Sequence, residues 1–249
     1  MQSTRNLRVL GGCGGWPEAG RAASGFLIDW DGFKIVLDLG YATFPRLITY
    51  CPASQVDAVV LTHAHADHCV DAHALYRARA YGGEKLPKIP LFCIEGVVER
   101  LAAFDPRADL HAVYDVCELP WPQRAGPFRI TGFELPHHVP NAAVRLEAPG
   151  ATLAYTGDTG PDPAIADLGA DADLFIAEAT AQGTPRSGGP QLHLTAGQAG
   201  AWAARAGARR LMLTHFWPGS DRAVSVAEAG AAFPGEILTA EDDLLVPLG

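Results

Sequence analysis

The sequence predicts an α/β fold in which mixed β-sheets lie inside and helices lie outside. Three observations lead to this prediction. Short runs rich in β-branched residues, such as Val56–Leu61, alternate with segments of helical periodicity. Glycine and proline are scattered between these segments and do not gather in one linker. The chain has 249 residues, 48% of them hydrophobic, which suffices for one large core. We therefore expect a single domain over residues 1–249.

The first third of the chain is predicted to consist mainly of strands. Two short apolar runs flank the turn Asp29–Gly32, and this pattern is typical of a β-hairpin. The apolar run Val56–Leu61 predicts a buried strand, and a cluster of histidines follows it directly. The predicted strands cover residues 7–10, 26–28, 34–37 and 56–61, and the predicted helix covers residues 71–81.

The remaining part continues the alternation of strands and helices. Thr195 and Gln198 have the spacing of a capping box, in which each side chain bonds the other residue's backbone N–H. Trp202 lies on the apolar face of the helix that follows, and Gly207 can end it. We predict strands over 91–94, 128–135, 143–147, 152–155, 174–177 and 211–213, helices over 96–104, 163–168 and 224–233, and two short strands at the end of the chain.

Composition narrows the classes of function. The net charge is −9, and Lys and Arg form no run, which argues against a broad nucleic-acid-binding face. The five cysteines are odd in number and form no C-x-x-C pair, so we expect neither a disulfide framework nor a Cys-based zinc site. No uninterrupted apolar run approaches membrane length, and the first ten residues have no apolar signal core. We expect a cytoplasmic protein that does not bind membranes.

Four candidate metal ligands lie within the six residues His63-Ala64-His65-Ala66-Asp67-His68. Neutral imidazole is a good zinc ligand, and a carboxylate oxygen is an acceptable one. Four ligands on one tight loop are too many for a single catalytic zinc that also needs distant ligands. The cluster therefore predicts two metals. The alternatives are a solvated loop with chance histidines and a structural zinc site, which would favour Cys ligands.

Three later strand ends carry further candidate ligands. His137 and His138 follow the predicted strand that ends at residue 135, Asp158 ends another strand, and His215 follows a third. Each alone is more often a cap or a satisfied polar group. Together with the first cluster they predict a binuclear site, in which Asp158 could bridge two cations.

The assembled motifs resemble the metallo-β-lactamase superfamily and, within it, the ribonuclease Z-like phosphodiesterase branch. The resemblance runs nearly end to end. It implies a four-layer αβ/βα sandwich, in which two facing mixed β-sheets are flanked by helices and the site lies along one edge. The motifs are the Gly-rich start through Pro17, Asp38-x-Gly40, Thr62-His63-x-His65-x-Asp67-His68, His137, Gly157-Asp158-Thr159, Glu178-Ala179-Thr180, His193-Leu194-Thr195 and Thr214-His215.

Carried over by motif, the resemblance implies two zinc ions, although manganese or iron could occupy similar sites. His137 is preferred to His138, because in similar proteins the ligand precedes a short segment like His138-Val139-Pro140. Asp38 is expected either to hold a ligand histidine by a hydrogen bond or to serve as a turn residue. The implied ligands are His63, His65 and His137 for one ion and Asp67, His68 and His215 for the other, with Asp158 as the bridge.

The resemblance also implies a mechanism, in which a metal-bridging hydroxide attacks phosphorus or a carbonyl carbon. Asp67 would orient or deprotonate this nucleophile while it remains a ligand. His193 is implied as the general acid for the leaving oxygen, supported by Glu178. The alternative is that His193 only covers a helix start and Glu178 caps a loop. His73 and His111 lie outside the pattern and are expected at the surface.

Differences between this sequence and other branches of the superfamily narrow the range of possible substrates. Class B1 β-lactamases have Cys in place of Asp158, and flavodiiron oxidoreductases have Glu in place of His65. Glyoxalase II-type enzymes carry a long helical domain for which little chain remains after His215. The stretch from His137 to Asp158 is too short for the exosite arm of tRNA 3′-processing enzymes, so long tRNA is disfavoured.

The sequence thus predicts a phosphodiesterase for a small or short substrate, such as a cyclic nucleotide or an oligonucleotide end. A lactone or ester hydrolase on the same site and a non-catalytic metal-binding module are the alternatives. The protein could also form a homodimer, because dimers are common among soluble homo-oligomers.

Overall fold

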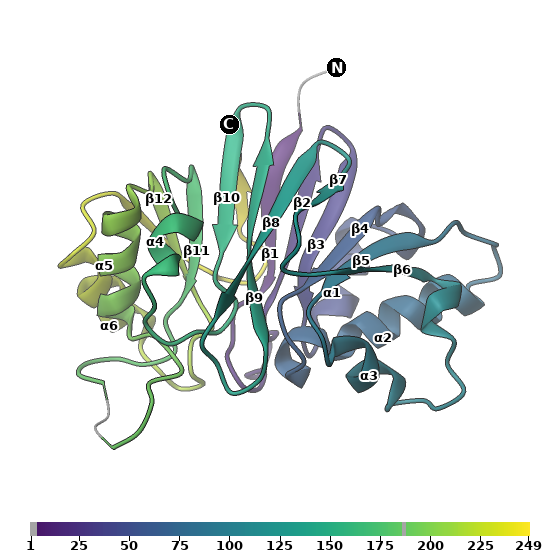
Figure 1. Ribbon diagram of the computed structural model, residues 1–249, viewed down its shortest axis with the longest axis horizontal. Helices are drawn as coiled ribbons and strands as arrows, with labels where there is room; N and C mark the ends of the chain where they lie inside the picture. The colour runs from purple at the N-terminus through teal and green to yellow at the C-terminus, as the bar shows by residue number, and fades with distance from the viewer. Residues whose placement is uncertain (1–3, 186–187) are drawn as a thin grey trace.

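The computed structural model describes residues 4–185 and 188–249 (Figure 1). In this part of the chain two mixed sheets face each other, with helices on their outer sides. The predicted four-layer αβ/βα sandwich is therefore confirmed. Helices α1, α2 and α3 lie on one side of the sandwich and α4, α5 and α6 on the other (Figure 1). Among the described residues, no helix combines the length and the apolar character needed to cross a membrane.

The first sheet has seven strands in the order β14-β1-β2-β3-β4-β5-β6. Strands β14, β1, β2 and β3 pair antiparallel, and β3 to β6 pair parallel. The predicted hairpin is confirmed, because β2 and β3 are joined at Asp31 and Gly32, both with positive φ. The elements of this half are β1 (Arg5–Gly11), β2 (Gly25–Trp30), β3 (Phe33–Leu39), α1 (Thr43–Tyr50), β4 (Ala58–Leu61), α2 (Ala66–Tyr81), β5 (Ile89–Cys93), α3 (Val97–Ala102), β6 (Tyr114–Glu118) and β14 (Leu245–Pro247).

The second sheet also has seven strands, in the order β13-β12-β11-β10-β9-β8-β7. Strands β7 to β10 pair antiparallel, and β10 to β13 pair parallel. Its elements are β7 (Gln123–Ala125), β8 (Phe128–Leu135), β9 (Asn141–Ala148), β10 (Ala151–Tyr155), α4 (Ala164–Leu168), β11 (Leu174–Glu178), α5 (Ala196–Ala206), β12 (Arg210–Thr214), α6 (Arg222–Gly230) and β13 (Glu236–Thr239).

Alternation along the central strands divides the core between two layers. In β11, Leu174 and Ile176 face the other sheet, whereas Phe175 and Ala177 pack against the helices on the outside. Successive side chains of a strand point to opposite faces, so a strand buried on both faces is apolar throughout. This accounts for the continuous apolar run that predicted the strand.

Helix α2 begins at Ala66, earlier than the predicted start at residue 71. The histidine cluster is therefore not one loop, since Asp67 and His68 lie in the first helical turn. A carboxylate is favoured there because the N-terminus of a helix carries partial positive charge. The predicted capping box is present at α5, where Thr195 accepts from the Gln198 N–H and Gly207 closes the helix with a φ of 69°.

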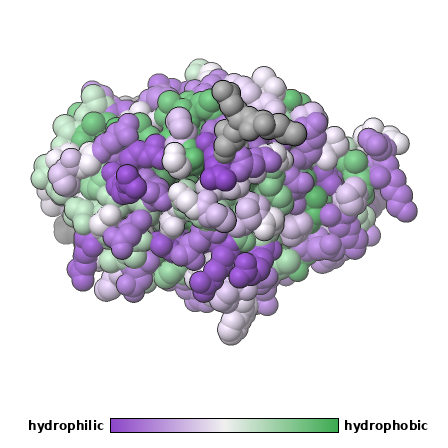
Figure 2. Space-filling view, turned by 90° about the horizontal axis from the view of Figure 1, so that it is seen from above, coloured by the Kyte–Doolittle hydropathy of each residue, from purple (hydrophilic) through white to green (hydrophobic). Residues whose placement is uncertain are grey.

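Strand β1 begins and strand β14 ends at the same edge of the sandwich, and the turn between β8 and β9 lies at the opposite edge (Figure 1). Figure 2 shows the face near the termini, where hydrophilic and hydrophobic residues are interleaved. The histidines and carboxylates that predicted a site gather at the other edge, near the β8–β9 turn.

Candidate metal centre

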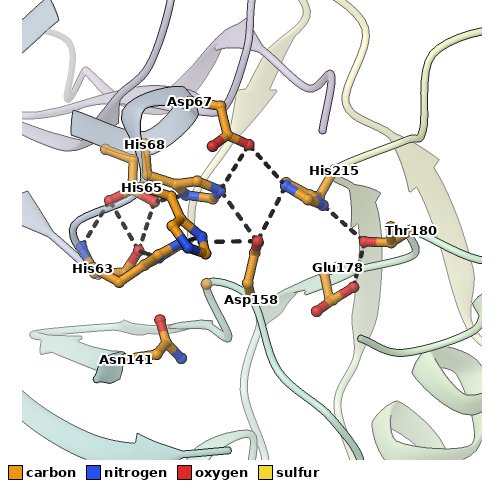
Figure 3. A network of polar contacts seen from close by, with 12 residues as sticks. His63, His65, Asp67, His68, Asn141, Asp158, Glu178, Thr180 and His215 are labelled. Atoms are coloured by element: carbon orange, nitrogen blue, oxygen red, sulfur yellow. Dashed lines mark hydrogen bonds and ion pairs between the residues drawn. The ribbon is translucent and has the colours of Figure 1, made fainter. Parts of the chain in front are cut away.

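The candidate centre is built from strand ends of both sheets. His63 follows β4 in the first sheet, and Asp158 and His215 follow β10 and β12 in the second. The carboxyl ends of parallel strands meet at one edge of a sheet, which brings Asp158 and His215 together. A β-bridge between His63 and Asn141 joins the two sheets at this edge. Figure 3 shows the side chains converging around Asp158.

One group of ligand atoms surrounds His65. Its Nδ1 lies 3.1 Å from Nε2 of His63 and 3.1 Å from Nε2 of His137. Oδ2 of Asp158 lies 3.6 Å from His137 Nε2 and 3.8 Å from His63 Nε2. These four atoms are close enough for one cation. His138 is exposed, with its ring 6.4 Å from that of His65, so His137 is the histidine that enters the cluster.

A second group lies across Asp158 and comprises Asp67, His68 and His215. Asp67 Oδ2 lies 3.2 Å from His215 Nε2 and 3.6 Å from His68 Nε2. Asp158 lies 3.2 Å from both of these imidazole nitrogens, through Oδ1 to His68 and Oδ2 to His215. Asp158 thus contacts both groups. The structure brings all seven sequence-predicted ligands together.

The hydrogen bonds at the back of the imidazoles determine which nitrogen faces the cluster. Four of the Nδ1 atoms face an acceptor, so each ring carries its proton there and turns the Nε2 lone pair inward. Because Nε2 lone pairs and carboxylate oxygens converge, the group that satisfies them is a cation. These bonds run from His63 Nδ1 to Thr62 Oγ1 (3.0 Å), His68 Nδ1 to Asp38 Oδ2 (2.7 Å), His137 Nδ1 to the Leu192 carbonyl (3.0 Å) and His215 Nδ1 to Thr180 Oγ1 (2.7 Å).

Two orphaned atoms support the same conclusion. His68 Nε2 and Asp158 Oδ1 are buried, and neither has a hydrogen-bond partner. A buried polar atom without a partner costs free energy, which a bound metal ion would recover. The His and Asp donor set suits divalent zinc, manganese or iron.

The shifted pKa values of three histidines indicate that the site favours a bound positive charge. Burial holds the pKa of His63 well below its usual range, and burial lowers the pKa of His137 to about 4, so both imidazoles are neutral ligands. Burial also acts against a charged His68, but the carboxylates of Asp158, Asp67 and Asp38 outweigh it and raise its pKa well above the usual value. In the described ranges, no Lys or Arg forms an ion pair or hydrogen bond with a candidate ligand.

Asp38 anchors the candidate ligand His68 and links the two sheets. Its buried carboxylate accepts from His68 Nδ1 at 2.7 Å, from the Thr62 N–H at 2.8 Å and from the Tyr155 hydroxyl of the second sheet at 2.8 Å. Its φ is 53°, and it lies inside β3 at a β-bulge, where the register with β2 shifts between Leu37 and Leu39. Of the two roles that the sequence left open, the structure shows the hydrogen bond to His68, and Asp38 lies within the strand and not in a turn after it.

His193 and Glu178 form a pair beside the second ligand group. His193 Nδ1 lies 3.2 Å from both carboxylate oxygens of buried Glu178, and its ring stacks on that of His215 at 5.6 Å. Burial disfavours the protonated ring, but the hydrogen bond and charge of Glu178 outweigh it and raise the pKa of His193 to about 9. The His193 side chain remains 27% exposed, so a substrate can reach it.

Two contacts at the site have no sequence signal of their own. Thr180 Oγ1 bonds both His215 and Glu178, although Thr180 entered the sequence argument only as part of a motif. The Gly15 N–H donates to Asp67 Oδ2 at 2.7 Å from the Gly-rich loop after β1. Every residue except proline has a backbone N–H, so residue types alone cannot show which one donates to Asp67. His73 and His111 lie outside the ligand groups. His111 is exposed, as expected, whereas His73 is half-buried beside Tyr76 and Phe104.

Comparisons of sequence and of structure relate this chain to known proteins. The family described as "Beta-lactamase superfamily domain" matches residues 36–216. The probable metallo-hydrolase YhfI of Bacillus subtilis is 31% identical over 84% of this chain and 86% of its own length. Its crystal structure superimposes with a TM-score of 0.87 over 97% of this chain and 99% of that chain, at 29% identity. A ribonuclease Z of Kineococcus radiotolerans is 30% identical over 92% of this chain and 90% of its own length.

Proposed function

Because the chain belongs to the beta-lactamase superfamily and is a metal-dependent hydrolase of that fold, we propose that it is a phosphodiesterase acting on a small or short phosphodiester. The observation that supports this most directly is the His193–Glu178 pair next to the ligand His215. An alkoxide that leaves phosphorus needs a proton, and a histidine with a raised pKa can supply it near neutral pH. The similarity to a protein named ribonuclease Z supports phosphodiester chemistry.

The proposed cofactor is a pair of zinc ions. His63, His65 and His137 would hold one ion and the group of Asp67, His68 and His215 the other, with Asp158 between them. When bound, two zinc ions lower the pKa of a shared water and neutralise charge on the substrate oxygens. The pair of ions also accounts for the orphaned atoms of His68 and Asp158.

The protein's own residues then have separate tasks. Asp67 is held by the Gly15 N–H, so it can orient the attacking water from a fixed position. His193 turns Nδ1 toward Glu178, which leaves Nε2 as the atom that would donate a proton to the leaving oxygen. Glu178 keeps that proton on His193 and fixes the ring's orientation.

Charge limits the size of the substrate. The net charge is −9, and long nucleic acids are bound mainly through Lys and Arg contacts to phosphates. A short phosphodiester needs few such contacts, because the metal ions and His193 can balance its charge. We therefore disfavour long tRNA as the substrate.

Two rate comparisons test this proposal. The zinc-loaded enzyme should hydrolyse bis(p-nitrophenyl) phosphate faster than any member of a lactone panel. A 2′,3′-cyclic nucleotide has a poor alkoxide leaving group, which needs a proton. On this substrate, His193→Ala should lower kcat by about 10²–10⁴-fold. Faster turnover of lactones, together with an unaffected His193→Ala variant, would show that the enzyme is an ester hydrolase.

A further inference from the structure

Two tryptophans lie at the rim of the candidate centre with about half of their surface exposed. Trp16 is 48% exposed and Trp217 is 45% exposed. Their rings meet edge to face, with centroids 4.9 Å apart and planes at 78°. No step of the proposed mechanism uses either residue. A contiguous exposed apolar patch, unlike a single exposed apolar side chain, is typical of a binding surface.

The chain holds this pair in place through the backbone. The Phe216 N–H donates to the Gly12 carbonyl at 2.9 Å, and the Gly14 N–H donates to the Phe216 carbonyl at 2.9 Å. The Gly219 N–H also donates to Glu18 at 2.9 Å. The loop after β1 and the segment after β12 are therefore paired on both sides of the tryptophans. The two indoles form a prearranged surface on fixed backbone.

The same two segments hold the second ligand group. Trp16 follows Gly15, whose N–H bonds the Asp67 carboxylate, and Trp217 lies two residues after His215. An ideal Cβ on Gly15 would lie 3.3 Å from the Trp217 ring, so this indole packs directly on the backbone that contacts Asp67. The tryptophan pair is thus continuous with the site where a phosphodiester would bind.

We propose that Trp16 and Trp217 form a stacking platform for a nucleobase of the substrate, a proposal that rests on the proposed phosphodiesterase function. Indole faces bind planar aromatic rings, and base–aromatic stacking is tolerant of sequence. A platform beside the metal ligands would hold the base while the phosphate lies at the metals. The substrate class is then a nucleoside phosphodiester, in preference to one without a base.

The electrostatics favour this mode of recognition. In the part of the chain that the structure describes, no Lys or Arg bonds a candidate ligand. Stacking provides affinity without adding charge.

The experiment compares two esters with the same leaving group. Thymidine 5′-(p-nitrophenyl phosphate) carries a base, and methyl p-nitrophenyl phosphate does not. In the zinc-loaded enzyme, Trp16→Ala and Trp217→Ala should each lower kcat/KM for the thymidine ester by roughly 5- to 150-fold. The methyl ester should change by less than about twofold, and Trp16→Phe and Trp217→Phe should recover most of the loss. Trp121→Ala is the matched control, because Trp121 is 66% exposed between β6 and β7.

A binding measurement separates this proposal from the proposed function. Titration calorimetry should show tighter binding of adenosine 5′-monophosphate than of ribose 5-phosphate, and Trp217→Ala should abolish the difference. If the wild type cleaves neither ester but keeps this tryptophan-dependent preference, the phosphodiesterase proposal is wrong and the platform stands. If both esters are cleaved and the tryptophan variants lower both rates equally or neither, the platform is wrong. Loss of a dimer in Trp16→Ala, with equal effects on both esters, would instead assign the pair to a subunit interface.

Discussion

The Thr180 hydroxyl oxygen lies 2.7 Å from Nδ1 of the candidate ligand His215. Because it accepts this proton, Thr180 can donate its own hydrogen to Glu178 (Figure 3). Glu178 in turn bonds His193. One hydroxyl thus connects a metal ligand to the carboxylate behind the proposed general acid. Such outer bonds set the tautomer and direction of a ligand imidazole.

Thr180→Val should therefore damage both metal binding and turnover. Valine keeps the shape of threonine but removes the acceptor for His215 and the donor for Glu178. We expect a loss of about 10- to 100-fold in zinc affinity or in kcat. Competition with a zinc chelator and steady-state kinetics would measure the two effects. Thr180→Ser retains the hydroxyl and should stay near wild type; equal defects in both variants would mean that the methyl group matters and the relay does not.

Metal removal should destabilise the fold as well as stop the reaction. Without a cation, the buried carboxylates and inward lone pairs of the centre repel one another. Metal held at about a thousand times its Kd contributes about 4 kcal/mol, which corresponds to roughly 8–16 °C in Tm for a chain of this size. Differential scanning calorimetry with and without a chelator measures the shift, and elemental analysis should find about two metal ions per chain. Asp158→Asn should bind fewer ions, whereas an unchanged Tm after complete metal removal would contradict the proposed centre.

Glu178→Gln should move the basic limb of the pH–rate profile. The proposed acid works when it is protonated, and its proton is lost as pH rises through the pKa of His193, which Glu178 raises to about 9. In the variant, burial is no longer outweighed, so the pKa falls and activity is lost at lower pH. The test is kcat/KM for a 2′,3′-cyclic nucleotide from pH 5 to 10. The same profile for a p-nitrophenyl ester is the control, since that leaving group needs no proton; identical basic limbs in wild type and variant would rule out the proposed role.

Gly14→Ala should disturb the ligand His215. An ideal Cβ at this position would lie 2.6 Å from Nδ1 of His215, closer than real side chains approach. The ring or the loop must shift, and with it the bond from Thr180 to the imidazole. We expect a fall of roughly 1–3 kcal/mol in the free energy of unfolding and a weaker second metal. Gly189→Ala, where an added Cβ meets nothing within 4 Å, is the matched control in denaturant titrations and metal analysis.

Local residue patterns were enough to predict most of the elements. Strand β11 could be predicted because a strand buried on both faces gives a continuous apolar run. Helix α5 could be predicted because Thr195 and Gln198 have the spacing of a capping box. The start of α2 was predicted too late, because the polar ligands Asp67 and His68 interrupt the apolar periodicity on which the prediction depended. A helix turn whose side chains face a polar site lacks the apolar periodicity of a helix turn that packs on the core.

By itself, the sequence determined the fold class, the family resemblance and the set of seven candidate ligands, because these depend on residue types at fixed spacing along the chain. The family resemblance already preferred His137 to His138, but only the tertiary structure placed His137 against His65 and left His138 exposed. Only the tertiary structure placed Asp38, at a bulge of β3, against His68. It also placed Trp16 beside Trp217. Such relationships depend on distances between residues that are far apart in the chain, and those distances are set by how the two sheets pack.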